Sequence, residues 1–315
     1  MLLANPIYDV VFKYLMEDME IAKGLIAMIL DTEIIEISVK PQETTTEIFL
    51  KNATPINIYR LDFLAVIKEK NGNQKKVLIE LQKTKRSTNI MRFRRYLGEN
   101  YQREDEITEN GQVKKQPLEI ITIYFLGFEL EDVETSILKV KNCFVDVTTG
   151  NPLGKETQSK FIRLLNHESY VIQIPFLKAN DKSRVERILN VFSQKYKTDD
   201  EHILNYKDEE EDATPPADPL LERILRRLIR AIADEKLRKR MDVEDEIETE
   251  MQDLESKLAE SRAVIEQKDQ QIEQKDQQIE QKDQQIEQNK QELEQKDQEL
   301  AVLRKLLEEL NKSKN

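Results

Sequence analysis

Hydrophobic and polar positions follow two patterns along the chain, and the change between them divides it. Within about the first 200 residues, short apolar runs occur at strand or helix spacing, and nearly all the Phe and Tyr lie there. After Lys207 the chain is charged, rich in Gln, or has Leu and Ile at regular intervals. This change predicts one globular domain over residues 1–205 and an elongated appendage after it.

The globular part contains several runs with the character of β-strands. Residues 56–70 alternate between apolar and polar, residues 71–73 (Asn-Gly-Asn) are a turn signal, and residues 75–84 read as a second strand, which predicts a β-hairpin. Residues 118–130 are almost continuously apolar and β-branched, as in a strand buried on both faces. Two further strands are predicted, at residues 142–149 and 169–177.

Helices are predicted between and beside these strands. Asn5 and Pro6 suit the start of a first helix, because Asn caps helices and Pro fits the first helical position. Other helices are predicted at residues 18–30, after Ser87, and at residues 184–196, each with apolar side chains at helical spacing. Helices and strands interleaved in this order predict a mixed α/β domain.

Two segments follow the globular domain. Residues 206–219 are acidic and Pro-rich without an apolar period, which is typical of a linker. An amphipathic helix is predicted over residues 220–250, with Asp218 as its cap and Pro219 at its first position. The pattern does not decide whether this helix docks on the α/β domain or begins an oligomer interface.

The tail, residues 251–312, repeats every seven residues, and IEQKDQQ occurs three times in succession. One position of the repeat, called a, is apolar throughout: Leu258, Ile265, Ile272, Ile279, Ile286, Leu293, Leu300 and Leu307. The d position is mostly Lys in the middle and Leu at the ends. A strict seven-residue period with Ile at a predicts a coiled coil that joins copies of the chain, with a dimer favoured. A single solvated helix is the alternative.

Composition limits both chemistry and location. Cys143 is the only cysteine, so one chain can form no disulfide, and its apolar surroundings predict a small buried side chain. No run reaches the length of a membrane helix, and the N-terminus lacks the features of a secretion signal, so we expect a cytoplasmic protein. His167 and His202 lie outside the motifs discussed below and are expected to be non-catalytic.

Charge is unevenly distributed along the chain. The net charge is −12, yet twelve Lys or Arg stand against only four acids between Arg60 and Arg103. Acidic residues are concentrated in the linker and the tail. The local positive excess favours a polyanionic partner.

The predicted hairpin carries a pair of acids. Glu80 and Gln82 lie two residues apart on one strand and share a face, and the turn places Asp62 opposite one of them, in a register that the sequence leaves open. Two carboxylates that converge repel unless a cation lies between them, and oxygen ligands suit Mg²⁺ or Mn²⁺. Glu80 stands within the apolar run VLIEL, where an acid without a partner is costly. This position argues against two ordinary solvent-facing acids.

With these residues the chain resembles the PD-(D/E)XK nuclease-fold family of transposases and recombination-promoting nucleases. The resemblance is carried by NPIYDVVFKYL (residues 5–15), by RLDFLAVIKEKNGNQKKVLIELQ (residues 60–82), and by Arg92 with Tyr96. It covers residues 4–130 with recognisable motifs and extends more loosely to about residue 200. It implies a restriction-endonuclease-like core, a mixed sheet flanked by helices, and Mg²⁺-dependent cleavage of DNA.

The resemblance also implies roles for single residues. Asp62 and Glu80 would hold the metal, and Asp9 would be an auxiliary acid from the first helix. Gln82 stands where many members of the wider fold have lysine, and Lys13, four residues after Asp9 on one helical face, is a candidate substitute cation. Contacts to DNA are predicted for the following residues: Lys85, Arg86, Arg92, Arg95 and Tyr96.

Several alternatives stay open. A catalytically inactive nuclease-fold protein that serves as a DNA-binding or scaffold module is favoured by Gln82, in place of the lysine, and by the low-complexity tail. Leu61, which replaces the proline of the namesake motif, is a second departure from the family pattern. Asp9 with Lys13 also suits a surface ion pair, and Arg92 with Tyr96 an ordinary pair on one helical face. A purely structural coiled-coil protein leaves the acid within VLIEL unexplained.

Overall fold

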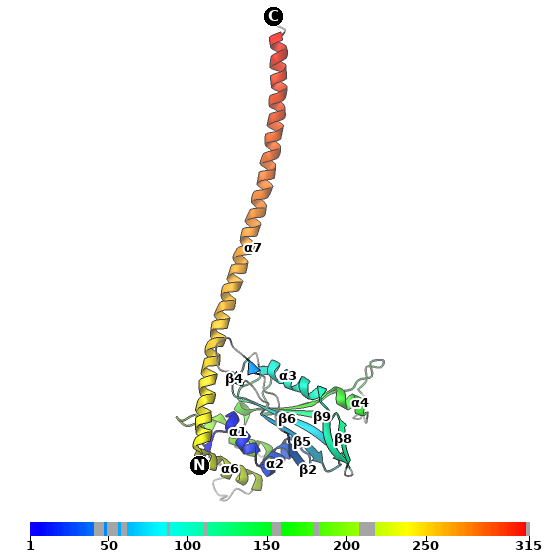
Figure 1. Ribbon diagram of the computed structural model, residues 1–315, viewed down its shortest axis with the longest axis vertical. Helices are drawn as coiled ribbons and strands as arrows, with labels where there is room; N and C mark the ends of the chain where they lie inside the picture. The colour runs from blue at the N-terminus through cyan, green and yellow to red at the C-terminus, as the bar shows by residue number, and fades with distance from the viewer. Residues whose placement is uncertain are drawn as a thin grey trace. The chain divides into compact units, whose positions relative to one another are not determined.

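A six-stranded mixed sheet forms the middle layer of residues 1–244 in the computed structural model (Figure 1). The structure describes residues 1–40, 47–48, 56–57, 62–86, 89–109, 112–152, 159–178, 183–207 and 218–312. Across the sheet the strands are β10 (Ile137–Val140), β11 (Glu168–Gln173), β9 (Glu119–Leu126), β6 (Gln74–Gln82), β5 (Phe63–Glu69) and β2 (Ile34–Val39). The central β9 runs parallel to β6 and β11, and the other neighbours are antiparallel. The predicted mixed α/β fold is confirmed.

The predicted hairpin is formed by β5 and β6. Phe63 pairs with Ile79 and Lys68 pairs with Gln74, around a turn in which Gly72 has a φ of +89°. Glycine adopts this conformation without the steric penalty of a side chain. Extended by one residue, the register places position 62 opposite Glu80, which the sequence left open.

Helices cover the two faces of the sheet (Figure 1). On one face, α1 (Asp9–Met16) and α2 (Met19–Leu30) pack against the odd-numbered side chains of β5 and β6, such as Phe63 and Ile79. On the other face, α3 (Asn89–Gln102) packs through Phe93 and Tyr96 on even-numbered side chains. Because side chains alternate along a strand, Glu80 and Gln82 fall on the face that α3 covers.

Helix α6 (Pro219–Ile232) packs into the core of the α/β unit, which decides between the two placements that the sequence left open. Its buried residues are Leu221, Ile224, Leu225, Leu228 and Ala231. Ile232, the last residue of the predicted apolar stripe, is only partly buried against the same core. Asp218 caps the helix through the backbone N–H groups of Leu220 and Leu221, as predicted. Asp18 caps α2 in the same way and also receives the Arg223 side chain of α6 at 2.9 Å.

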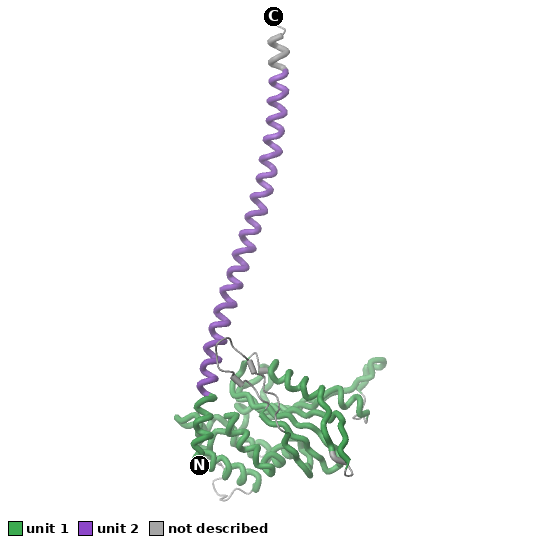
Figure 2. The backbone as a smooth tube through the Cα atoms, in the orientation of Figure 1, with its two compact units in different colours: residues 1–244 green, residues 245–315 purple. Residues whose placement is uncertain are grey.

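A second helix, α7 (Glu235–Lys312), starts directly after α6. The single helix predicted over residues 220–250 is therefore wrong, because Asp234 interrupts it and accepts hydrogen bonds from Lys236 N and Leu237 N. The chain divides into two compact units, residues 1–244 and 245–315 (Figure 2). Leu237 and Met241 are buried in the core of the first unit. The second unit is helical over the residues that the structure describes.

Shorter elements complete the fold. Paired strands are β1 (Leu2–Ala4) with β12 (Ile203–Asn205), β3 (Glu47–Ile48) with β4 (Ile56–Asn57), and β7 (Asp105–Glu109) with β8 (Gln112–Gln116). Short helices are α4 (Lys160–Leu165), α5 (Arg184–Leu189), and 3-10 turns at Ile174–Phe176, Asn190–Phe192 and Gln194–Tyr196. In the described ranges, none of the helices combines the length and apolar character that crossing a bilayer demands.

Two predicted helices differ from the structure. The first begins at Asp9 rather than at Pro6, because the buried Asn5 side chain bonds Ile7 N and the distant Glu201 O and Gln194. The α-helix predicted over residues 184–196 ends at Leu189, and two 3-10 turns follow it, at Asn190–Phe192 and Gln194–Tyr196. The cap predicted at Ser87 and the departure at Leu61 lie outside the described residues.

The strand predicted over residues 142–149 is also wrong. Only an isolated bridge between Val145 and Pro152 forms there. Asp146 instead accepts a hydrogen bond from Thr148 N and is followed by Gly150 at a φ of +71°, so the polar side chains support a turn. Cys143 is consequently exposed, contrary to the buried position predicted for it.

Candidate functional site

Asp62 and Glu80 lie side by side at one end of the β5–β6 hairpin. Asp62 directly precedes β5 and is 7% exposed, and Glu80 in β6 is fully buried. The Asp62 carboxylate accepts a hydrogen bond from the backbone N–H of Leu81, the residue after Glu80. This bond fixes the first acid beside the second, as the hairpin predicted.

The electrostatics of Asp62 report how close the acids are. Burial raises the pKa of Asp62 well above its ordinary value, and the neighbouring Glu80 and Asp9 carboxylates raise it further. Lys13 opposes this shift. Burial likewise raises the pKa of Glu80, although Arg92 acts in the opposite direction. Three carboxylates, from the residue before β5, from β6 and from α1, therefore lie within electrostatic range of one another.

Asp9 and Lys13 reach this cluster from the first helix. Lys13 Nζ lies 2.6 Å from Asp9 Oδ2 and 3.8 Å from Asp62 Oδ1. The two residues are one helical turn apart, so their side chains share a face. The ion pair left open by the sequence is present, and it is directed at Asp62 rather than isolated on the surface.

Arg92 of α3 lies against Glu80 from the other side. Its guanidinium forms an ion pair with Glu80 Oε1, and the Arg92 Nε to Oε1 distance is 3.1 Å. Tyr96 is buried one turn later, and burial together with Glu80 raises its pKa. Tyr124, opposite Glu80 on β9, was not predicted, and its ring centroid is 4.4 Å from that of Phe93. The Arg92–Tyr96 pair thus contacts the acid region directly.

Three residues bear on which group could replace the lysine that many members of the wider fold have at position 82. Gln82 is 7% exposed and shares the face of Glu80, as predicted. The ammonium group of Lys83 lies 4.0 Å from the ring centroid of Tyr8, on the face that α1 covers. Lys13 is the lysine whose ammonium group approaches Asp62.

The positive charge between Arg60 and Arg103 is partly neutralised by acids from other elements. Lys75 pairs with Glu69 at 2.9 Å, and the buried Lys76 pairs with Asp105 at 2.7 Å. Among the predicted DNA contacts, Lys85 pairs with Glu131, and Arg92 pairs with Glu80. Arg95 is exposed on α3, together with its neighbour Arg94, and Arg86 lies shortly before that helix. Arg94 and Arg95 of α3 are therefore among the exposed cations of this stretch, together with Lys70, Lys85 and Arg103.

The donor chemistry of the acids fits a hard divalent cation. Glu80 Oε2 and Asp9 Oδ1 are buried and accept no hydrogen bond from any residue that the structure describes. A cation would satisfy such oxygens and relieve the repulsion that raises the pKa of Asp62. Within the same described ranges, no three His, Cys, Asp or Glu side chains gather as metal ligands. Mg²⁺ commonly takes one or two carboxylates and keeps several waters, so Asp62 and Glu80 meet that requirement.

A fourth acid, Glu244 of α7, was missed by the sequence reasoning. Its carboxylate accepts hydrogen bonds from Asp9 N at 3.0 Å and Val10 N at 2.9 Å. Burial and the nearby Asp9 raise the pKa of Glu244 to about 7. No local pattern could reveal this contact, because 235 residues separate Glu244 from Asp9.

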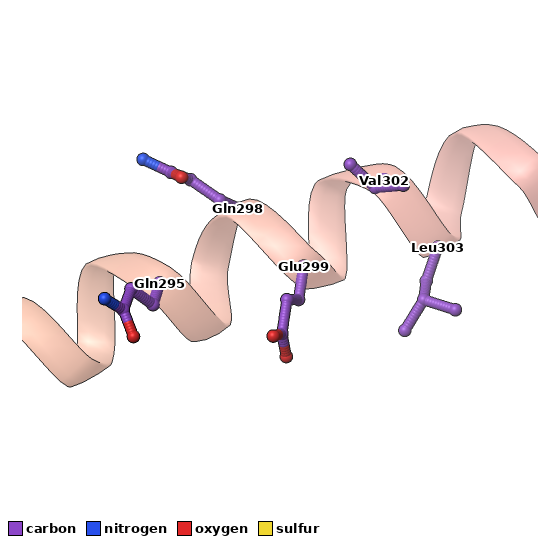
Figure 3. A pocket seen from close by; sticks show the side chains of 5 residues that line it. All are labelled: Gln295, Gln298, Glu299, Val302 and Leu303. Atoms are coloured by element: carbon purple, nitrogen blue, oxygen red, sulfur yellow. The ribbon is translucent and has the colours of Figure 1, made fainter.

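A hollow on the surface of α7 lies away from these residues in the sequence. Its lining residues are Gln295, Gln298, Glu299, Val302 and Leu303 (Figure 3). All five stand on one helix, with Gln298 and Val302 pointing to one side and the others to the opposite side. The hollow is therefore an open helix surface rather than an enclosed site.

Comparisons with protein-family models, with curated proteins and with solved structures yield no match. The structure shows a mixed α/β fold with buried acids at one end of the β5–β6 hairpin.

Proposed function

We propose that this protein is a metal-dependent DNA endonuclease with a PD-(D/E)XK core, similar to transposases and recombination-promoting nucleases. The observation that carries the proposal is the convergence of Asp62, Glu80 and Asp9 beside Lys13, where burial first and then the two neighbouring acids raise the pKa of Asp62. Buried acids that repel one another lower the stability of a fold. Clusters of this kind are concentrated at functional sites. A polyanionic substrate agrees with the exposed arginines of α3.

The residues would divide the work as follows. Asp62 and Glu80 would hold Mg²⁺ or Mn²⁺, which when bound supplies positive charge to a phosphate and lowers the pKa of a bound water. Gln82 would orient water or phosphate through its amide, and Asp9 would assist. Lys13 would supply the positive charge that a glutamine lacks.

Binding of the DNA backbone is assigned to the region around the start of α3. Arg86, Arg94 and Arg95 are the proposed phosphate contacts, since guanidinium groups bind phosphate oxygens in a forked geometry. Lys85 would exchange its exposed partner Glu131 for a phosphate, because surface ion pairs contribute little to stability. Arg92 and Tyr96 would shape the site from beside Glu80.

The tail would bring two copies of the site together. On the helix of the second unit, the apolar side chains at a are about half exposed, for example Ile265 at 58% and Ile272 at 56%. A regular apolar seam of this kind is stabilised by pairing with a second copy. Two sites in one dimer suit the cutting of two DNA strands of opposite polarity.

A nicking assay tests the proposal. Supercoiled plasmid is incubated with the full chain and Mn²⁺ or Mg²⁺, beside the Asp62→Ala variant and the matched control Glu104→Ala, an exposed acid close to the end of α3. We expect nicking by the wild type and the control, and a loss of roughly a thousandfold or more in Asp62→Ala. Equal nicking by Asp62→Ala would reject the assignment of the site.

A catalytically inactive DNA-binding or scaffold protein is the second candidate. The observation in its favour is that Arg92 and Lys13 already neutralise Glu80 and Asp9, so the acids have partners without a metal. Thermal unfolding separates the two functions. A nuclease should gain stability from Mn²⁺ in the wild type and lose that gain in Glu80→Gln. A scaffold should show the same unfolding temperature with and without Mn²⁺ in both proteins.

A further inference from the structure

Helix α1 begins without a cap from its own neighbourhood. The residue at its N-cap position, Tyr8, makes no capping hydrogen bond through its side chain and is fully buried. The first N–H groups of a helix have no partner within the helix, and Asp, Asn, Ser or Thr normally supplies one. In α1 the partner comes from α7, because the two Glu244 oxygens accept the N–H groups of Asp9 and Val10 at 3.0 and 2.9 Å.

The base of α7 is held firmly on the first unit around this contact. Leu237 and Met241 are buried in its core, and Arg238 forms an ion pair with Asp200 at 2.6 Å. Glu244 follows on the same helix, one turn after residue 240 and within the same unit. Its carboxylate is therefore presented to α1 by a rigid element rather than by a mobile side chain on a loop.

The contact lies next to the acid cluster. The backbone N–H of Asp9 donates a hydrogen bond to Glu244, and the Asp9 carboxylate binds Lys13 and lies near Asp62. Helix α1 is only eight residues long, so its first turn contains a large share of its hydrogen bonds. The negative charge of Glu244 also complements the positive end of the helix dipole. Burial near Asp9 opposes that charge, which agrees with a pKa of about 7 for Glu244.

We propose that Glu244 is a positioning residue that caps α1 from α7 and so holds Asp9 and Lys13 in place beside Asp62. The inference rests on the proposed function, because it assigns Glu244 to the geometry of that site. Glu244 touches neither substrate nor metal in this assignment. It acts through Asp9, and it ties the acid cluster to the helix that also carries the heptad repeats.

Hydrogen exchange tests the cap without reference to activity. Exchange is measured by mass spectrometry on the full chain, for wild type, Glu244→Ala, Glu244→Gln and the control Glu246→Ala, an exposed acid on the same helix. We expect the amides at the start of α1 to exchange roughly fivefold faster in Glu244→Ala. Glu244→Gln keeps one acceptor oxygen, so its exchange rate should lie between those of the wild type and Glu244→Ala. The control should exchange at the wild-type rate. Unchanged exchange in Glu244→Ala overturns the cap.

Nicking kinetics test the positioning role. If Asp9 and Lys13 act in the reaction, Glu244→Ala should lower kcat roughly tenfold with little change in KM, since the DNA contacts on α3 are untouched. Faster exchange with an unchanged kcat overturns the positioning role. If Glu244→Ala does not fold, the same test is made with Glu244→Gln, in which kcat should fall by less. A wild type without any nicking removes the proposed function and the positioning role together, and faster exchange then retains Glu244 as a structural cap only.

Discussion

Asp62 and Glu80 are buried charges whose partners differ in kind. Asp62 is held by the backbone N–H of Leu81 and approached by Lys13, whereas Glu80 is paired with the Arg92 side chain. A buried carboxylate that loses its partner costs several kcal/mol, on the order of 3–5. The Leu81 hydrogen bond and the Lys13 and Arg92 ion pairs therefore offset part of the cost of burying the two acids next to each other. The ionised form of Asp62 is disfavoured by burial and by repulsion from both Glu80 and Asp9, which raise its pKa.

Stability should depend on pH through Asp62. The native pKa of Asp62 is raised, first by burial and then by Glu80 and Asp9, so folding favours its protonated form. The resulting stability is fully present below the unfolded pKa of about 3.9 and is lost as pH rises through the native pKa. Asp62→Asn removes this dependence and keeps an oxygen for Leu81 N. We therefore expect the free energy of unfolding of Asp62→Asn to increase relative to that of the wild type as pH rises from 4 to 8.

Urea unfolding in the presence of a chelator measures this difference, because a bound cation would favour the ionised acid. Glu104→Gln, an exposed acid, is the control and should follow the wild-type pH curve. Parallel curves for Asp62→Asn and the wild type would contradict the raised pKa of Asp62.

At the scale of elements, α6 shows how a predicted helix acquires its role. Its stripe of apolar residues is visible in the sequence, and its cap at Asp218 is local. Its packing with α1, α2 and the sheet depends on surfaces that are distant in sequence. Arg223 and Arg227 add polar contacts, to Asp18 and to the Tyr14 carbonyl. The helix is consequently part of the α/β core rather than a spacer.

Two adjacent residues of α6 offer a matched test of this packing. Leu228 is fully buried and Ile229 is 44% exposed. Leu228→Ala should lower the free energy of unfolding by about 2–5 kcal/mol, because it removes a buried side chain and leaves a cavity. Ile229→Ala should change it by less than about 0.5 kcal/mol. Near-UV circular dichroism follows the first unit, since every Phe and Tyr precedes Lys207. Similar losses for both variants would mean that α6 is not docked in solution.

At the scale of the whole molecule, the two units obtain their stability in different ways. The first buries a large apolar core between helices and a sheet. The second is a helix whose apolar residues remain exposed within a single chain, as at Ile279 (55%) and Leu293 (65%). Long isolated helices gain little from propensity alone, and most helices in proteins depend on packing of an apolar face. A second copy is the partner that we expect to supply this packing.

Substitutions in the three identical heptads test the pairing. Replacing Ile265, Ile272 and Ile279 with Ser should weaken the dimer at least about a thousandfold, since each Ile would be buried at the seam. Sedimentation equilibrium measures the dissociation constant. Replacing Gln270, Gln277 and Gln284 with Ser should leave the dissociation constant unchanged, because these residues lie on the outer face of the same heptads. A wild type that sediments as a monomer would exclude the coiled coil and leave the single solvated helix.

The sequence by itself determined the elements whose signals are local. The hairpin of β5 and β6, the strand β9, helix α2 and the heptads of α7 all follow from periodicity and turn chemistry within short windows. It also pointed to Asp62 and Glu80 through an acid in an apolar strand, to Asp9 through the family resemblance, and to Lys13 through its spacing of one helical turn from Asp9. Local propensities and alternation act between near neighbours, so they are readable from the order of residues.

The tertiary structure alone decided which distant groups meet. The hairpin register set Asp62 opposite Glu80, Arg92 was drawn to Glu80, and Glu244 became the cap of α1. The same holds for Asn5, whose partners Gln194 and Glu201 stopped a helix from starting at Pro6. A buried charge or N–H group must find a partner wherever the packed chain brings one, and that choice depends on three-dimensional proximity rather than on spacing along the chain.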